Sequence, residues 1–143
     1  MNESPIPQGK YIPASRHNDL VYTSGMTPRI NGVLQFSGPV KASEPIETYR
    51  EAVRLAAGNA LTAARAAVGT QEYISRVVTL SVFIATAEGF TAHARVADFA
   101  SEYFHEELGD DGVGSRAAIG VASLPGNAPV EIQLVAAVSK RSA

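Results

Sequence analysis

The sequence predicts an α+β fold with the element order β-β-α-β-α-β-β, in which one sheet carries two helices on one of its faces. Three observations predict it: short segments rich in β-branched residues, two long segments with apolar residues at helical spacing, and turn-forming glycine, proline and asparagine between them. The length of 143 residues suits one domain, so we expect residues 1–143 to form a single unit. Hydrophobic residues make up 45% of the chain, which is enough for a buried core.

The first part of the chain predicts an extended arm and then two strands. Residues 1–15 contain three prolines, which favour an extended arm over a helix. Residues 20–24 are rich in β-formers and are followed by a glycine, which predicts a strand that stops there. The dipeptide Asn31-Gly32 is a two-residue hairpin signal, and it predicts that residues 33–36 form the returning strand.

Two helices are expected, one on each side of the longest strand. Ser43 is a candidate N-cap of the first helix, alanines recur at helical spacing over 52–67, and Gly69 is a candidate C-cap. The second helix is predicted over 88–108 and ends at Gly109. Because the apolar stripe of the first helix is mostly alanine, that helix can lie close to the sheet.

Three further strands are predicted in the second half. Residues 73–85 contain a dense run of β-branched and aromatic residues, which predicts a central strand covered on both faces. Residues 116–121 form a strand after a glycine-rich loop, residues 125–127 a turn, and residues 130–138 the last strand. Because two helices cover only one sheet face and the strands are apolar, the other face predicts association between copies of the chain.

Composition excludes several kinds of function. The chain has no cysteine, so disulfides, thiolate zinc sites and a cysteine nucleophile are excluded. Its net charge is -2 and its twelve basic residues are scattered, so nucleic acid is not an expected partner. No apolar run is long enough to span a membrane and the N-terminus lacks the pattern of a signal peptide, so we expect a cytoplasmic protein with no membrane partner.

Motifs for nucleophilic, metal and nucleotide sites are weak. Ser24 lacks the Gly-x-Ser-x-Gly elbow, so we interpret it as a serine that ends a strand rather than as a nucleophile. His17, His93 and His105 lie in polar stretches without metal-ligand spacing, so we expect solvent-exposed histidines and no metal. The glycine-rich segment 112–116 is not followed by the lysine and helix of a phosphate loop, which argues against a nucleotide site.

Two charged residues in strands are the main candidates for a site. Arg116 begins an otherwise uncharged apolar strand, so its guanidinium needs partners or water. It either grips a ligand carboxylate bidentately or forms a structural ion pair, for which Glu131 is a candidate partner. Alternation places Glu131, Gln133 and Val135 on the face away from the core. Glu131 is therefore either a solvated strand residue or a residue at an interface.

Four segments of the chain resemble the RidA (YjgF-like) family of reactive-intermediate deaminases. They span nearly the whole chain and consist of residues 20–25, 76–83, 115–125 and 130–133. The last two segments, at their mutual spacing, are the most specific, and other parts resemble a less studied branch of the family. The resemblance implies a chorismate mutase-like fold and a homotrimer, in which three sheets form an inner barrel with the helices outside.

The resemblance also implies a reaction and a set of site residues. The reaction is hydrolysis of 2-imino or 2-enamino acids to 2-keto acids and ammonia, in clefts between subunits and without a metal or organic cofactor. By resemblance, Arg116 holds the substrate carboxylate, while Glu131 and the backbone carbonyl of Ala118 position the catalytic water. Ala118 replaces a frequent cysteine of the family and Asp98 replaces an asparagine. The substrate-binding positions that the resemblance implies besides Arg116 are Tyr11, Ser24, Ala118 and Asp98.

Two other functions stay open at the level of sequence. One is a non-catalytic trimer that binds a small carboxylate in the same clefts, because a fold alone does not fix a function. The other is the endoribonuclease or translation inhibitor activity under which this family was once described. The net charge of -2 and the missing basic stripe argue against that activity.

Overall fold

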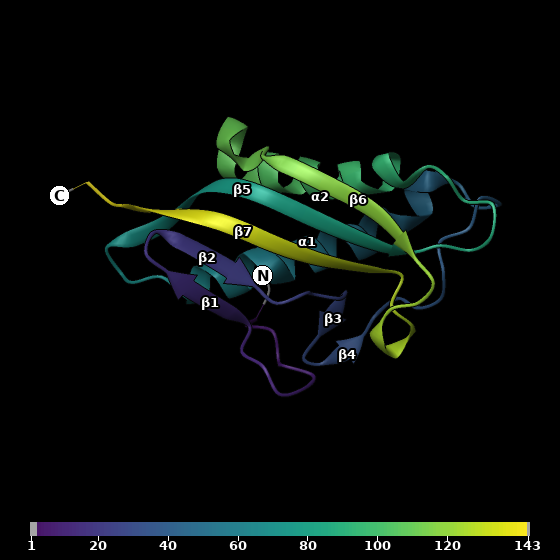
Figure 1. Cartoon of the computed structure of the whole chain (residues 1–143), viewed down its shortest axis with the longest axis horizontal. Coiled ribbons are helices and arrows are strands. Elements are labelled where there is room, and N and C mark those ends of the chain that lie inside the picture. Colours follow the sequence, from purple (N-terminus) through teal and green to yellow (C-terminus); the bar gives the residue numbers. More distant parts are fainter. Residues whose placement is uncertain (1–2, 143) are drawn as a thin grey trace.

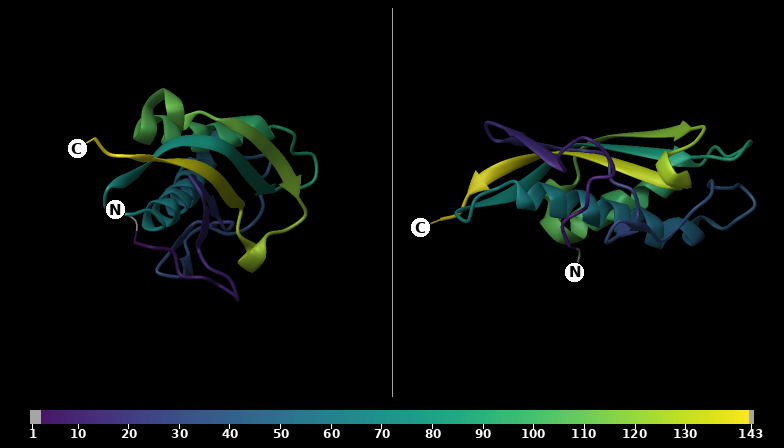
Figure 2. Two further views of the ribbon diagram at one scale, coloured as in Figure 1. Left: turned by 60° about the vertical axis from the view of Figure 1, so that its left-hand side comes forward. Right: turned by 90° about the horizontal axis from the view of Figure 1, so that it is seen from below.

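A computed structural model describes residues 3–142, and in it a five-stranded mixed sheet carries two helices on one face (Figure 1). The strand order is β1-β2-β7-β5-β6, with β5 parallel to β6 and antiparallel to β7. This confirms the predicted α+β class and the layer of two helices, which Figure 2 shows below the sheet in its right-hand view. The strands of this sheet are β1 (Ala14–His17), β2 (Leu20–Thr23), β5 (Glu72–Ala85), β6 (Ser115–Val121) and β7 (Val130–Lys140). The helices are α1 (Arg50–Ala66) and α2 (His93–Leu108).

The N-terminal strands pair differently from the prediction. Residues 14 and 15 belong to β1, so the extended arm is shorter than residues 1–15, and β1 rather than residues 33–36 pairs with β2. Asn31-Gly32 does form a hairpin turn, with φ of 50° and 80°, but it joins β3 (Arg29–Ile30) and β4 (Val33–Leu34) in a separate small sheet. The dipeptide specifies the turn, not the sheet that its two arms join, and this is why the prediction was wrong.

Both helices begin later than predicted. A 3₁₀ turn, Ile46–Tyr49, precedes α1, and Ser43 is not the cap, because Pro45 is still extended at ψ 144°. The C-cap is Ala67 rather than Gly69. Helix α2 begins at His93 rather than at residue 88, since Gly89 adopts a φ of 88° that interrupts helical backbone. Its end is as predicted, with Gly109 at φ 73°.

The core lies between the two helices and one face of the sheet. Helix α1 contributes mainly alanines, which are fully buried and let it lie close to the strands. On β7, Val130, Ile132 and Leu134 are buried while Gln133 is exposed, so the predicted alternation is confirmed. No helix within residues 3–142 has the length and hydropathy that a membrane crossing requires.

The second face of the sheet is uncovered in a single chain. Large apolar side chains are exposed on it, including Tyr22 at 42%, Tyr73 at 41% and Ile119 at 46%. Strand β5 lies inside the sheet, between β7 and β6, but alternate residues along it are buried, so only one of its faces is covered within the chain. The expectation of two covered faces is therefore not met by one copy, whereas a bare apolar face is present as predicted.

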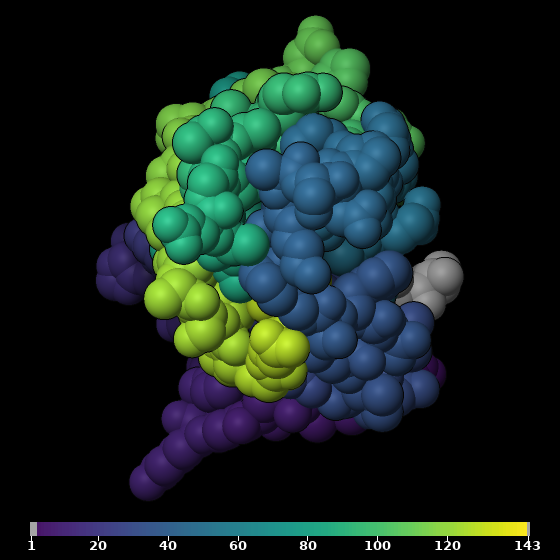
Figure 3. Space-filling view, turned by 90° about the vertical axis from the view of Figure 1, so that its right-hand side faces the viewer, coloured from purple at the N-terminus to yellow at the C-terminus, as the bar shows by residue number. Residues whose placement is uncertain are grey.

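One end of the molecule is closed by the turn that precedes β7. The turn Pro125–Asn127, predicted from its residues, packs against the segment that follows β4, as Figure 3 shows. The backbone N–H of Gly38 donates to the carbonyl oxygen of Asn127 at 2.9 Å. This contact fixes the start of β7, which carries Glu131.

An ion pair between β1 and β5 predicts how stability depends on acid pH. Arg16 Nη2 donates to Glu72 Oε2 at 2.7 Å, and the backbone N–H of Gly69 donates to Glu72 Oε1 at 2.9 Å. The hydrogen bonds from Arg16 and then from Gly69 lower the pKa of Glu72 from 4.5 to about 2. The charged form is favoured in the folded state, so this stabilisation is present above pH 4.5 and is lost as the pH falls through about 2.

We therefore expect Glu72→Gln to make the free energy of unfolding less sensitive to acid. Urea unfolding of both proteins at neutral pH and at about pH 3 measures this, and the wild type should lose more stability than the variant. Glu102→Gln is the control, since its carboxylate lies 3.5 Å from Arg50 in a looser surface pair. Equal acid sensitivity of wild type and Glu72→Gln would contradict the assignment.

Candidate functional site

Arg116 lies at the start of β6 and points toward α2. It pairs in register with buried Leu80, so it shares the face that the helices cover. Its Nη1 donates to Asp98 Oδ1 at 2.9 Å and to Ser101 Oγ at 3.0 Å, and its Nη2 donates to the carbonyl oxygen of Ala94 at 3.3 Å. All three acceptors belong to α2. The guanidinium is therefore held by the helix that packs over its strand, and Asp98 supplies the counter-charge.

Glu131 lies on the opposite face of the sheet. It pairs in register with Phe83, three residues beyond the Leu80 that neighbours Arg116, and its chain neighbours Val130 and Ile132 point into the core. The candidate ion pair between Arg116 and Glu131 is therefore not formed, because strand alternation places the two side chains on different faces. Arg116 does form an ion pair, but with Asp98. Within one chain the two main candidate residues do not come together.

The carboxyl group of Glu131 lies in the space beside Gly25. A Cβ atom on Gly25 would overlap Oε2 and Cδ of Glu131, so the missing side chain of Gly25 makes room for the carboxyl group. The group has no hydrogen-bond or ion-pair partner within residues 3–142. Burial raises the pKa of Glu131 above its ordinary value. A half-buried carboxyl group without a partner is a candidate for proton transfer.

Ser24 and Tyr11 lie on the same side of the molecule as Gly25. The hydroxyl of Ser24 donates to the carbonyl oxygen of Ile12 at 2.6 Å, and its backbone N–H donates to Pro13 at 2.8 Å, so Ser24 fastens the arm to the end of β2. This agrees with a serine that ends a strand. The hydroxyl of Tyr11 accepts from the backbone N–H of Gln8 at 2.9 Å, and Tyr11 lines a pocket together with Gly25.

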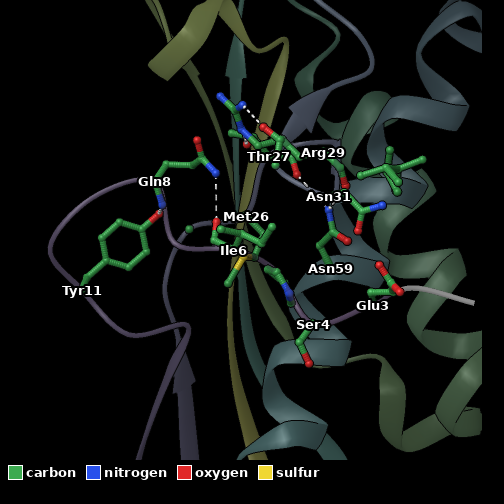
Figure 4. A pocket seen from close by; sticks show the side chains of 15 residues that line it. Glu3, Ser4, Ile6, Gln8, Tyr11, Met26, Thr27, Arg29, Asn31 and Asn59 are labelled. Atoms are coloured by element: carbon green, nitrogen blue, oxygen red, sulfur yellow. Dashed lines mark hydrogen bonds between the residues drawn. The ribbon is translucent and has the colours of Figure 1, made fainter.

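That pocket, of about 330 Å³, lies between the arm, the β3–β4 hairpin and α1 (Figure 4). Asn59 of α1, which is 6% exposed, donates from Nδ2 to the carbonyl oxygens of Thr27 at 3.1 Å and Arg29 at 2.9 Å. Arg29 in turn donates to Gly32 at 2.9 Å and holds the hairpin. Sequence reasoning did not assign Asn59 or Arg29 to a pocket. The sequence did offer one signal for Asn59, because its amide lies on the alanine-rich stripe of the helix. A polar group buried there needs a hydrogen-bond partner.

The three histidines have different surroundings. His17 and His105 are exposed, as predicted, and His105 lies 3.1 Å from Asp110 Oδ1 in the last turn of α2. The prediction is wrong for His93, whose ring packs edge-on against Phe90 with centroids 5.4 Å apart and lies against Gly120. No three histidine, aspartate or glutamate side chains within residues 3–142 gather closely enough to hold a metal ion.

The candidate residues thus form two half-sites in one chain. The first, the arginine half, consists of Arg116, Asp98 and Ala118, at the free edge of β6 and under α2. The second, the glutamate half, consists of Glu131 and the Ser24–Gly25 corner on the other face. A reaction that uses both halves needs a second copy of the chain.

Comparisons with known proteins agree with this fold. The model of the family described as endoribonuclease L-PSP matches residues 1–138. Protein TCP17 of Trypanosoma cruzi is 32% identical over 113 residues, which cover 78% of this chain and 71% of that protein. The crystal structure of Atu1372 from Agrobacterium tumefaciens, a protein of unknown function, is 32% identical with a TM-score of 0.83, and the match covers 94% of this chain and 86% of that one.

The structure of the YjgF gene product of E. coli is more distant in sequence. It is 21% identical with a TM-score of 0.66, and the match covers 94% of this chain and 92% of that one. This likeness confirms the chorismate mutase-like α+β fold. With the family model matching residues 1–138, the chain belongs to the endoribonuclease L-PSP family, which is the RidA (YjgF-like) family.

Proposed function

We propose that the chain hydrolyses reactive 2-imino and 2-enamino acids to 2-keto acids and ammonia, in a site that two copies complete. The observation that carries the proposal is Glu131, a half-buried carboxyl group with a raised pKa, no partner within residues 3–142, and a place against Gly25. Such a group has no evident structural purpose, and it suits the transfer of protons. Family membership supports the class of reaction.

The reaction requires only a bound water molecule, a group that transfers protons and a substrate held in position. An enamine first takes a proton at C3 and so becomes the protonated imine. A water molecule then adds to C2, and its released proton passes to Glu131. Glu131 returns this proton to the amino nitrogen, which leaves as ammonia, while the new hydroxyl gives its proton to the Glu131 carboxylate and becomes the keto oxygen. That last proton then passes to ammonia, which gives ammonium. One water is consumed, and one 2-keto acid and one ammonia are formed. Positioning of water, substrate and carboxyl group supplies most of the acceleration.

Arg116 holds the substrate carboxylate in this proposal. Nε and the second hydrogen of Nη2 have no partner within residues 3–142, so the guanidinium can accept a ligand while Asp98 and Ala94 keep it in place. Ala118, two residues along the same strand, offers its backbone carbonyl to the water or the amino group. Ser24 lines the substrate from the glutamate half of the other copy, and Tyr11 lines it from the arm of that copy.

A homotrimer brings the two half-sites together in this proposal. The uncovered sheet face carries the exposed apolar side chains Tyr22, Tyr73 and Ile119, and β6 has a free edge beside Arg116. Closed cyclic association buries that face and repeats the same contact around the ring. Each contact then sets the arginine half of one copy beside the glutamate half of the next.

Turnover of freshly generated 2-aminoacrylate tests the proposal. We expect the assembled protein to accelerate formation of pyruvate and ammonia above the uncatalysed rate in the same buffer. If the correctly assembled protein gave no acceleration, the proposed hydrolysis would be refuted. The binding of a small carboxylate would then be the remaining function for this site. Incubation with single-stranded RNA at several salt concentrations tests the activity in the family's description, and we expect no cleavage because the chain has a net charge of -2.

A further inference from the structure

Arg116 and Asp98 form a close ion pair of nearly zero net charge, and some of its hydrogen-bonding atoms have no partner within residues 3–142. Nη1 and Asp98 Oδ1 lie 2.9 Å apart, and the side chains are 22% and 56% exposed respectively. The second oxygen of Asp98, Oδ2, has no hydrogen-bond partner within residues 3–142, and neither does Nε of Arg116. The unit therefore keeps a free donor on Arg116 and a free acceptor on Asp98.

This arrangement responds differently to ligands of different charge. A plain carboxylate that binds Arg116 is also repelled by the negative charge of Asp98, which pairs with another nitrogen of the same guanidinium, so part of its attraction is cancelled. A ligand with a cationic nitrogen next to its carboxylate is attracted by both members of the pair. The net charge of the unit thus favours zwitterions over anions of the same size.

We propose that Asp98 is a specificity-determining residue that selects zwitterionic 2-iminium acids and disfavours the 2-keto acid product. The inference rests on the proposed function for the placement of the substrate carboxylate at Arg116. Hydrolysis removes the cationic nitrogen from the carbon skeleton, so the product loses its contact with Asp98 and keeps only the repulsion. Asp98 therefore favours release of the product after each turnover.

Two small molecules with one carbon skeleton test this directly. L-Alanine carries both charges and pyruvate carries only the carboxylate, and the affinity of each for the assembled protein can be measured by calorimetry or by NMR titration. We expect wild-type protein to bind alanine more tightly than pyruvate. In Asp98→Asn the affinity for alanine should fall and the affinity for pyruvate should rise, by about tenfold each. The variant should therefore prefer pyruvate.

Glu107→Gln is the matched control. It removes one negative charge from the same helix, where Glu107 pairs with Arg65 at 3.2 Å near the C-terminal end, so the order of the two affinities should not change. Because Asp98 is 56% exposed, its replacement by the isosteric asparagine leaves the packing intact. An unchanged ratio of affinities in Asp98→Asn would overturn the inference.

Arg116→Ala separates this inference from the proposed function. If Arg116→Ala no longer binds alanine or pyruvate, this supports Arg116 as the binding position of the carboxylate, on which the inference depends. Unchanged binding of both molecules would overturn the inference. A reversed preference in Asp98→Asn combined with no turnover of 2-aminoacrylate by the wild type supports zwitterion selection and refutes the hydrolysis. The two failures are therefore distinguishable.

Discussion

Arg116→Ala is expected to lower turnover of 2-aminoacrylate by about tenfold to more than a hundredfold. A charge-assisted hydrogen bond to a carboxylate contributes roughly 1.5–3 kcal/mol, and the substrate loses its main anchor when the guanidinium is removed. Arg116→Lys should recover only part of the rate, because an ammonium group cannot present two parallel N–H donors. Initial rates of ammonia release at several substrate concentrations measure both variants.

The stability of Arg116→Ala decides how a loss of rate is interpreted. Its partner Asp98 is 56% exposed and remains solvated after the substitution, so the free energy of unfolding should change by only about 0–1 kcal/mol. Arg76→Ala is the matched control, since Arg76 pairs with Asp111 at 2.8 Å on the surface of the same domain and belongs to neither half-site. Wild-type turnover in Arg116→Ala with an intact assembly would remove Arg116 from the mechanism.

Much of the fold could be predicted from local patterns in the sequence. Helix α1 follows from alanines at helical spacing, and β5 and β7 follow from β-branched runs, because both patterns report burial of one face. The end of α2 was predictable because Gly109 permits the positive φ found there. The pairing of β2 was not, since Ala14–His17 is a short strand directly after prolines and its pairing with β2 is a tertiary contact.

The candidate site was predicted less completely than the fold. Alternation along β7 gave the face of Glu131, and Arg116 was singled out because a charge in an apolar strand needs partners. The identity of that partner could not be predicted, because it depends on which helix packs over β6 and on where Asp98 falls along it. The sequence pattern predicts only that Gly25 ends a strand, whereas its lack of a side chain also makes room for Glu131.

Two impaired variants are expected to restore activity when they assemble together. Arg116→Ala has an intact glutamate half and Glu131→Gln has an intact arginine half, because the two half-sites lie on opposite faces of one sheet. In a cyclic trimer that contains both variants, one contact of the ring pairs the two intact halves. Such mixed trimers should therefore regain about one third of the wild-type rate, while each variant alone keeps only its low residual rate.

Co-expression with two different affinity tags and sequential purification isolates the mixed assemblies, and ammonia release from 2-aminoacrylate measures their rate. Recovery to about one third of wild type is the predicted result, since each ring then holds one complete site. A mixed assembly as inactive as its two parents would show that Arg116 and Glu131 serve one reaction within a single chain or none at all, and would contradict a site shared between copies.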